Sequence, residues 1–297
     1  YGQPAIAAAL GHGLGATVQA SADGPWLSIP RWGADGLAVR PTQDGKGDAM
    51  SRAFAVALQR TGLPADAALR VTVDGQLPLG VGLGSSAAFA VALLRGLSDF
   101  GDDTLSEAAL SEAAAAIEGI FHGNPSGLDH TVVITGQCLH FTRVEGAKIR
   151  EVELAVEVPL VISWTQRSGT TREAVAGLAA RHAECPDLFD TLFEAMGELA
   201  KQGREALETG NLRRLGTLFD LNHGYLNACG VSSPANEHMV NLARDAGAWG
   251  AKLTGAGRGG ASIALAPEQP DVVIARLKAA GFDALFTTVR RHPKGRF

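Results

Sequence analysis

The sequence predicts an α+β protein built from two lobes, and three observations support this prediction. The chain has 297 residues, which is more than one typical hydrophobic core accommodates. In its first half, strand patterns precede helical patterns, and after Pro159 the helical patterns dominate. We therefore place a boundary near residues 154–159, with an N-terminal lobe at 1–155 and a C-terminal lobe at 156–297.

The N-terminal lobe opens with two apolar strand patterns separated by a turn-rich stretch, which predicts that these two strands pair. Next we expect a helix, a strand and two long helices. After these we expect a hairpin around Gly136 and one more strand. In order, the elements are Ala5–Leu10, Ala16–Ala20, Asp48–Gln59, Leu69–Val73, Ser85–Leu97, Leu105–Ile120 with Asp103 or Thr104 as its N-cap, Thr131–Phe141 and Lys148–Val152.

The C-terminal lobe begins with the pattern of a buried strand and continues mainly as helices. Strands are expected at Leu160–Trp164, around Lys252, at Ala261–Leu265 and at Ala284–Val289. Helices are expected at Thr171–Ala183, Leu188–Glu208, Leu212–Ala228, Pro234–Ala246 and Gln269–Ala280.

Composition narrows the functional classes. A net charge of −5 provides no broad positive field, so neither nucleic acid nor an anionic membrane is an expected partner. No run of 18 apolar residues is present, which argues against a membrane span. The cysteines are odd in number, widely spaced and without a C-x-x-C pair, which favours a reducing, cytoplasmic location.

The strongest motif is a glycine-rich segment, Pro78–Ala88, that leads into a helical pattern. Its glycines alternate at positions 80, 82 and 84, so the backbone can adopt torsions closed to other residues and its N–H groups can converge on phosphate oxygens. Ser85 and Ser86 add hydroxyl groups that can bind phosphate or Mg²⁺. The alternative is an ordinary glycine-rich turn with a serine N-cap. The Gly-Lys-Ser/Thr ending of a Walker loop is absent.

The second motif is the stretch from Glu118 to Asp129, in which Gly123 and Pro125 interrupt a helix. We expect the loop to bring Asp129 to the start of a strand, so that two carboxylates face one site. Metal-assisted phosphoryl transfer needs such a pair, because one carboxylate holds Mg²⁺ and the other accepts the proton of the attacking hydroxyl. Taken singly, each carboxylate could be a surface charge. His122 could bind substrate or only stabilise the loop.

The third motif, Lys252–Ala261, is a second glycine-rich stretch between two strand patterns. Its glycines would allow close packing against the first motif or against a substrate pocket. Such turns are common, and a functional interpretation is favoured only because the other two motifs occur in the same sequence.

In order and spacing, the three segments resemble the GHMP kinases, and among these the mevalonate kinases. The segments His122–Asp129 and Lys252–Gly257 carry most of the resemblance, with support from Tyr1–Ala5, Asn222, Asn227 and Gly230–Ser232. The resemblance covers nearly the whole chain. It implies an N-terminal lobe like ribosomal protein S5 domain 2, a ferredoxin-like C-terminal lobe, and ATP-dependent phosphorylation of the 5-hydroxyl of mevalonate. It also allows a homodimer.

The resemblance implies a role for each matching residue. Asp129 would be the catalytic base, and Ser86 and Glu118 would hold Mg²⁺. ATP phosphates would be bound by Gly80, Val81, Gly82, Leu83, Gly84, Ser85 and Ser86. Substrate would be bound by His122, Thr171, Gly255 and Ala256.

Three features depart from the family pattern. The family has a lysine and a histidine upstream of the position of Tyr1, and we expect that they belong to residues preceding the given sequence. Arg258 stands where the family has glycine, and His130 follows the proposed base where asparagine is frequent; His130 receives no role here. The alternatives are a sister kinase acting on phosphomevalonate, homoserine or a sugar, and a non-catalytic binding protein that retains the fold.

Overall fold

The computed structural model describes seven stretches of the chain, and for Arg172 the backbone only. These stretches are residues 2–31, 36–42, 45–76, 80–123, 126–142, 148–165 and 171–290. They belong to two compact units, each assembled from more than one segment. Unit 1 comprises Tyr1–Gly11, Gly80–Leu83 and Gly136–Phe297, and unit 2 comprises His12–Leu79 and Gly84–Thr135. A single lobe boundary near residue 155 stays a prediction.

Unit 2 contains a four-stranded mixed sheet. Its order is β2 (Leu14–Ala20), β5 (Leu69–Gly75), β3 (Trp26–Ile29) and β4 (Leu37–Val39). The pair β2–β5 is antiparallel, β3–β5 is parallel and β3–β4 is antiparallel. The sequence analysis predicted the two longer strands, β2 and β5, and missed the short strands β3 and β4.

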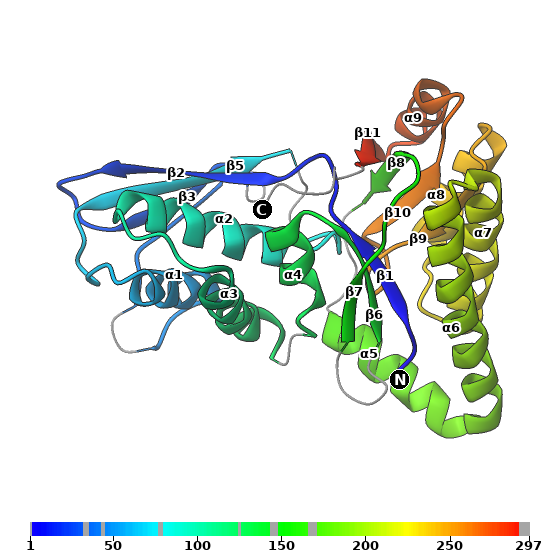
Figure 1. Cartoon of the computed structure of the whole chain (residues 1–297), viewed down its shortest axis with the longest axis horizontal. Coiled ribbons are helices and arrows are strands. Elements are labelled where there is room, and N and C mark those ends of the chain that lie inside the picture. Colours follow the sequence, from blue (N-terminus) through cyan, green and yellow to red (C-terminus); the bar gives the residue numbers. More distant parts are fainter. Residues whose placement is uncertain are drawn as a thin grey trace. The chain divides into compact units, whose positions relative to one another are not determined.

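The helices of unit 2 cover one side of this sheet (Figure 1). They are α1 (Ala49–Arg60), α2 (Ser85–Phe100), α3 (Glu107–His122) and α4 (Leu128–Thr135). Helix α2 lies against β2 at Gly96, where an added Cβ would come within 2.8 Å of the Ala16 Cβ. Fully buried Phe54, Leu93 and Ile117 contribute to the core that the helices share with the sheet.

Two of the predicted elements in unit 2 are wrong in part. Helix α3 begins two residues later than predicted, with Ser106 as its N-cap in place of Asp103 or Thr104. The predicted strand after Thr131 is helix α4, and the hairpin around Gly136 does not form. The β-branched run Thr131–Thr135 favours a strand by propensity, but here Thr131 and Thr135 donate their hydroxyls to carbonyls four residues earlier, and the helix packs against α2 and α3.

Unit 1 contains two antiparallel sheets. One has the order β1 (Ala5–Ala8), β6 (Cys138–Thr142) and β7 (Lys148–Glu151). The other has the order β11 (Asp283–Val289), β8 (Val158–Trp164), β10 (Ala261–Leu265) and β9 (Gly250–Leu253). The predicted pairing of the first two strands is therefore wrong, since β1 pairs with β6 and β2 pairs with β5.

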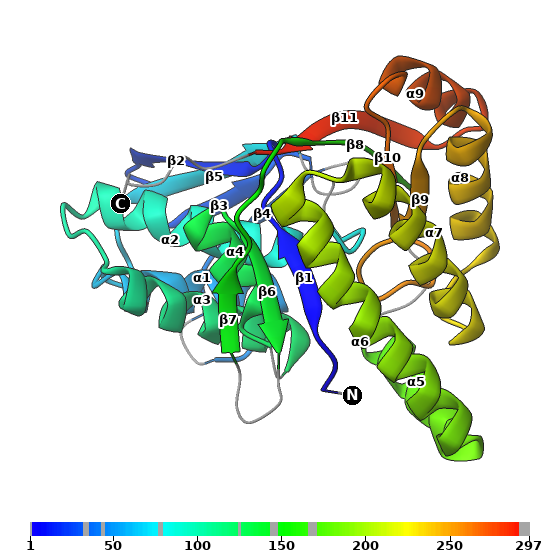
Figure 2. The same cartoon turned by 45° about the vertical axis from the view of Figure 1, so that its right-hand side comes forward.

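Five helices complete unit 1, close to the predicted positions. They are α5 (Thr171–Glu184), α6 (Pro186–Thr209), α7 (Leu212–Ala228), α8 (Pro234–Asp245) and α9 (Pro270–Ala279). Helices α6 and α7 lie side by side in both orientations (Figures 1 and 2). Helix α7 also approaches β9 closely, since a Cβ on Gly250 would lie 2.0 Å from the carbonyl oxygen of Gly216. Only glycine permits this approach.

No helix in the described stretches has both the length and the apolar character required to cross a membrane.

Candidate active site

The first glycine loop, residues 80–84, has the backbone that the sequence analysis predicted. Gly80, Gly82 and Gly84 have φ values of 78°, 88° and 69°, in the region where side chains are strained. Gly84 is the N-cap of α2 and has no side chain that could cap the helix. The positive end of the α2 helix dipole therefore lies directly after the glycine loop, and such a helix start favours an anion. Pro78 and Leu79, which precede the loop, lie outside the described residues.

Two carboxylates of unit 2 come from different helices. Glu118 lies in α3 and is buried, with 2% of its surface exposed. Asp129 lies in the first turn of α4, so the expectation that it starts a strand is wrong. Asp129 therefore lies at the positive end of a helix dipole, where a carboxylate is stabilised.

His130 completes this group and is the residue that the sequence analysis missed. Its Nδ1 lies 2.6 Å from Oε2 of Glu118, and both side chains are buried. With the segment interpreted as a strand, nothing indicated that the residue after Asp129 would face α3. In a helix, adjacent residues point about 100° apart, so His130 can face α3 while Asp129 faces solvent.

The pKa of Asp129 is raised above its usual value. The largest cause is the loss of solvation as protein atoms crowd the carboxyl group, and the second is the nearby negative charge of Glu118. His122 and His130 act in the opposite direction. The side chain keeps accessible surface, so the desolvation is partial and the group can still meet a ligand. A raised pKa suits a general base, because the proton acceptor is then better matched to neutral pH.

His122 connects this group to the start of α2. Its Nε2 lies 2.9 Å from Oγ of Ser86, and its charge also influences Asp129. Four residues predicted for the site, Ser86, Glu118, His122 and Asp129, therefore gather within unit 2. Asn124 and Pro125, which join α3 to the next helix, lie outside the described residues.

In unit 1, the second glycine loop, residues 254–260, packs against the first. Gly255 has a φ of 71°, and an added Cβ would lie 2.4 Å from the carbonyl oxygen of Gly82. A Cβ on Gly260 would lie 2.4 Å from the carbonyl oxygen of Val81. Of the two alternatives for the third motif, the structure shows the close packing on the first motif, and at these two positions only glycine fits.

The remaining predicted site residues are found at separate positions in unit 1. Ala256 is half-buried in the second glycine loop, and Thr171 opens α5 directly after residues 166–170, which are not described. Arg258 adopts a left-handed φ of 57°, which favours the glycine that the family has at this position. Its guanidinium lies beside α5, 3.3 Å from where a Cβ on Gly177 would be.

Comparisons with known proteins agree with these observations. A family model described as the GHMP kinases N terminal domain matches residues 49–137, and one described as GHMP kinases C terminal matches residues 204–283. The mevalonate kinase of Methanothermobacter thermautotrophicus is 32% identical over 277 residues, which cover 93% of this chain and 88% of that protein. The mevalonate kinase of Pyrococcus abyssi is 38% identical over 226 residues, which cover 74% of this chain and 66% of that protein.

Among solved structures, the crystal structure of L. major mevalonate kinase in complex with R-mevalonate is similar, with a TM-score of 0.86 and 28% identity. The match covers 99% of this chain and 91% of that one. The chain spans about two thirds of the length of the Pyrococcus abyssi relative. Both family models, the relatives and the mixed helix-and-sheet fold lead to one conclusion: this chain belongs to the GHMP kinase family.

Proposed function

We propose that the protein transfers the terminal phosphate of ATP to the 5-hydroxyl of mevalonate. The observation that carries the proposal is the cluster in unit 2, where Asp129 and Glu118 lie with His122 and Ser86 near the start of a helix preceded by alternating glycines. Phosphoryl transfer depends mainly on positioning and on neutralising charge, and these side chains supply both.

Asp129 is the proposed base in this reaction. Its raised pKa and its retained accessibility suit a carboxylate that aligns the substrate hydroxyl and accepts its proton. The N–H groups of residues 80–86 would bind the phosphates of ATP. Holding both reactants in line can lower the barrier by roughly 7–11 kcal/mol in favourable cases.

Mg²⁺ is the proposed metal, and the donor chemistry fits it. Ser86 and Glu118 offer a hydroxyl and a carboxylate, which are the hard oxygen ligands that Mg²⁺ prefers. Among the described residues, no group of three His, Cys, Asp or Glu side chains is arranged to hold a metal ion by itself. Mg²⁺ commonly takes one or two protein ligands together with phosphate oxygens and water. Bound there, it would neutralise charge on the phosphates.

Mevalonate is the proposed acceptor because the relatives compared above are mevalonate kinases. The residues proposed to bind it are His122, Thr171, Gly255 and Ala256. A homodimer and a cytoplasmic location remain predictions.

A sister kinase acting on phosphomevalonate, homoserine or a sugar is the alternative. A phosphorylated acceptor would require additional cations near the substrate, and the cations nominated from the sequence are Arg172 and Arg258. The guanidinium of Arg258 lies beside Gly177 of α5. Assays with a phosphorylated acceptor test whether it serves as such a cation.

The experiment is a coupled ADP-release assay on the full-length protein with Mg²⁺-ATP and, separately, mevalonate, phosphomevalonate, homoserine and galactose. We expect kcat/KM for mevalonate to exceed the others by at least about a hundredfold, as expected where buried polar groups match only one acceptor. A preference for another acceptor would replace mevalonate within the family. No turnover with any of them, despite ATP binding, would favour a non-catalytic protein.

The metal role of Glu118 has its own test. Replacing Glu118 with Gln removes the charge and keeps the shape, so the Mg²⁺ concentration for half-maximal activity should rise about tenfold or more. Activity is titrated with Mg²⁺ at fixed ATP. Because Glu118 also contacts His130, the melting temperature is measured alongside. An unchanged Mg²⁺ titration in a folded variant would remove Glu118 from the metal site.

A further inference from the structure

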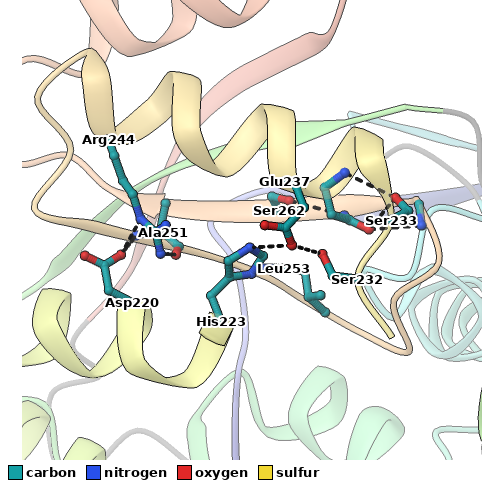
Figure 3. A network of polar contacts seen from close by, with 11 residues as sticks. Asp220, His223, Ser232, Ser233, Glu237, Arg244, Ala251, Leu253 and Ser262 are labelled. Carbon is teal, nitrogen blue, oxygen red and sulfur yellow. Dashed lines mark hydrogen bonds and ion pairs between the residues drawn. The ribbon is translucent and has the colours of Figure 1, made fainter. Parts of the chain in front are cut away.

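The second glycine loop begins at the end of an edge strand, and α7 covers that edge. Strand β9 is the last in its sheet and pairs on one side with β10. On its other side, the N–H of Ala251 donates to Oδ1 of Asp220 at 2.9 Å, and the N–H of Leu253 donates to Nδ1 of His223 at 3.3 Å (Figure 3). The two acceptors lie three residues apart on α7, hence on one face of that helix. Together they satisfy backbone groups that a sheet edge would leave exposed.

The far end of the loop is held from α8. The N–H of Gly259 donates to Oδ1 of Asn236 at 3.0 Å, and Nδ2 of Asn236 donates to Oγ of Ser262 at 3.3 Å. Asn236 has no exposed surface. Oδ1 of Asn236 also accepts a hydrogen bond from Oγ of Ser233 at 2.9 Å, so the amide joins the loop, β10 and the start of α8. The C-terminal end of the loop is therefore held by a buried side chain that is not among the predicted site residues.

The middle of the loop rests on the turn between α7 and α8. The N–H of Arg258 donates to the carbonyl of Val231 at 2.7 Å, and a Cβ on Gly257 would lie 2.2 Å from the same oxygen. Arg181 of α5 donates from Nη1 to the carbonyls of Cys229 and Gly230, both at 2.9 Å, and so secures that turn. The loop thus has fixed contacts at its start, middle and end.

The acceptor role of His223 requires that Nδ1 carry no proton. Its other nitrogen, Nε2, lies 3.1 Å from Oε1 of Glu237, an oxygen that also accepts a hydrogen bond from Ser232 (Figure 3). This approach is an electrostatic contact and not a well-aligned hydrogen bond. A carboxylate so close to Nε2 favours the tautomer with the proton on that nitrogen, which leaves Nδ1 as the acceptor for the N–H of Leu253.

We propose that His223 and Asn236 are positioning residues for phosphoryl transfer. They hold the second glycine loop in place, and through the contacts of Gly255 and Gly260 they hold Gly82 and Val81 of the first loop. This inference rests on the proposed function, in which the first loop binds the phosphates of ATP. Both residues act only through the two loops.

The chain offers a matched control. Asp220 accepts from the N–H of Ala251 as His223 accepts from that of Leu253, on the same face of α7 but two residues farther from the loop. Oδ1 of Asp220 also pairs with Nε of Arg244 at 2.7 Å. Replacing Asp220 with Ala should therefore lower stability while leaving the loops in place.

The test compares kinetics and melting temperature for four variants. His223→Leu and Asn236→Leu remove an acceptor from the loop, and each should raise KM for ATP about fivefold or more, the equivalent of roughly 1 kcal/mol. In His223→Asn, Oδ1 can replace Nδ1, so KM should return to within about twofold of the original value. Asp220→Ala should lower the melting temperature with KM within about twofold. Equal KM effects for His223→Leu and Asp220→Ala, or no rescue by His223→Asn, would overturn the proposal.

A second measurement needs no variant. Hydrogen exchange on the unmodified protein follows residues 80–83 and 254–260 with and without a non-hydrolysable ATP analogue. Because the loops contact each other, we expect the analogue to slow exchange in both. Slowing confined to residues 80–83 would overturn the inference and leave the proposed function standing. An absence of both analogue binding and turnover in the unmodified protein would overturn the proposed function and the inference together.

Discussion

Asp129 lies near charged groups of both signs, and these groups determine the expected effect of replacing its carboxylate. Loss of solvation and then the charge of Glu118 raise its pKa, whereas His122 and His130 lower it. Because the proposed ATP-binding residues do not include Asp129, Asp129→Asn should retain ATP affinity while turnover falls by about two to four orders of magnitude. Single-turnover kinetics and an ATP titration measure the two effects separately. Normal turnover in a folded variant would mean that another group accepts the proton.

Lys252 is a charged residue in β9, and burial lowers its pKa to about 8. The folded state therefore binds its proton less tightly than the unfolded state. The resulting loss of stability is complete below pH 8 and is relieved as the pH rises from about 8 toward the usual value of 10.5. The side chain of Lys252 keeps some accessible surface, which reduces this loss of stability.

Lys252→Met should therefore be more stable than the parent at pH 7, and the difference should shrink as the pH approaches 10. Urea unfolding at several pH values measures it. The control is Lys278→Met, because Lys278 is exposed on α9. A gain in stability that stays constant up to pH 10 would show that packing of the methionine, and not removal of the buried charge, is responsible.

At the scale of elements, α1 depends on its N-cap. Oδ1 of Asp48 accepts hydrogen bonds from the N–H groups of Met50 at 2.8 Å and Ser51 at 2.9 Å. The hydrogen bond from the Ser51 N–H is the largest of the causes that lower the pKa of Asp48. The carboxylate therefore stabilises the fold above pH 3.8, and this contribution is lost as the pH falls through the lowered value.

Asp48→Ala should cost about 1 kcal/mol of stability at pH 7, the usual effect of losing an N-cap. The difference between parent and variant should shrink below pH 4, where the parent carboxyl takes up a proton. Urea unfolding at pH 7 and in the acid range measures both. Asp48→Ser, which keeps an acceptor without the charge, should recover most of the loss at pH 7. A variant as stable as the parent at pH 7 would contradict the capping role.

Elements were predictable from the sequence where local signals sufficed. Periodicity located the helices of both units except α4, and the alternation of Gly80, Gly82 and Gly84 anticipated their positive φ values. Helix α4 was not predictable, because its β-branched residues favour a strand and only packing against α2 and α3 makes it helical. His130 was missed as a direct consequence, since its contact with Glu118 exists only in a helix.

At the scale of the whole molecule, strand pairing lay beyond the sequence patterns. An apolar strand pattern shows which face is buried and does not identify the partner, so β1 was assigned to its neighbour in sequence although it pairs with β6. The contacts of His223 and Asn236 were unpredictable for the same reason, because they join residues brought together only by the packing of α7 and α8 on the sheet.

Unit 2 has its own core, made of residues from its sheet and from all four of its helices. We therefore expect a fragment of residues 12–135 to unfold cooperatively by itself. A fragment of residues 136–297 lacks β1 and also Val81, which packs with Ile162 and Ala261, so it should unfold at lower urea or without cooperativity. Circular dichroism during urea unfolding compares the two. A cooperative transition in the second fragment alone would contradict this division.

The pairing of β1 with β6 also governs the order of events on the ribosome. Strand β1 leaves the exit tunnel before β6, and the whole of residues 12–135 is synthesised between the two. During that interval unit 2 can already collapse around its own core, whereas the hydrogen bonds between β1 and β6 cannot yet form. Translation therefore favours a nascent chain in which unit 2 matures before β1 and β6 pair.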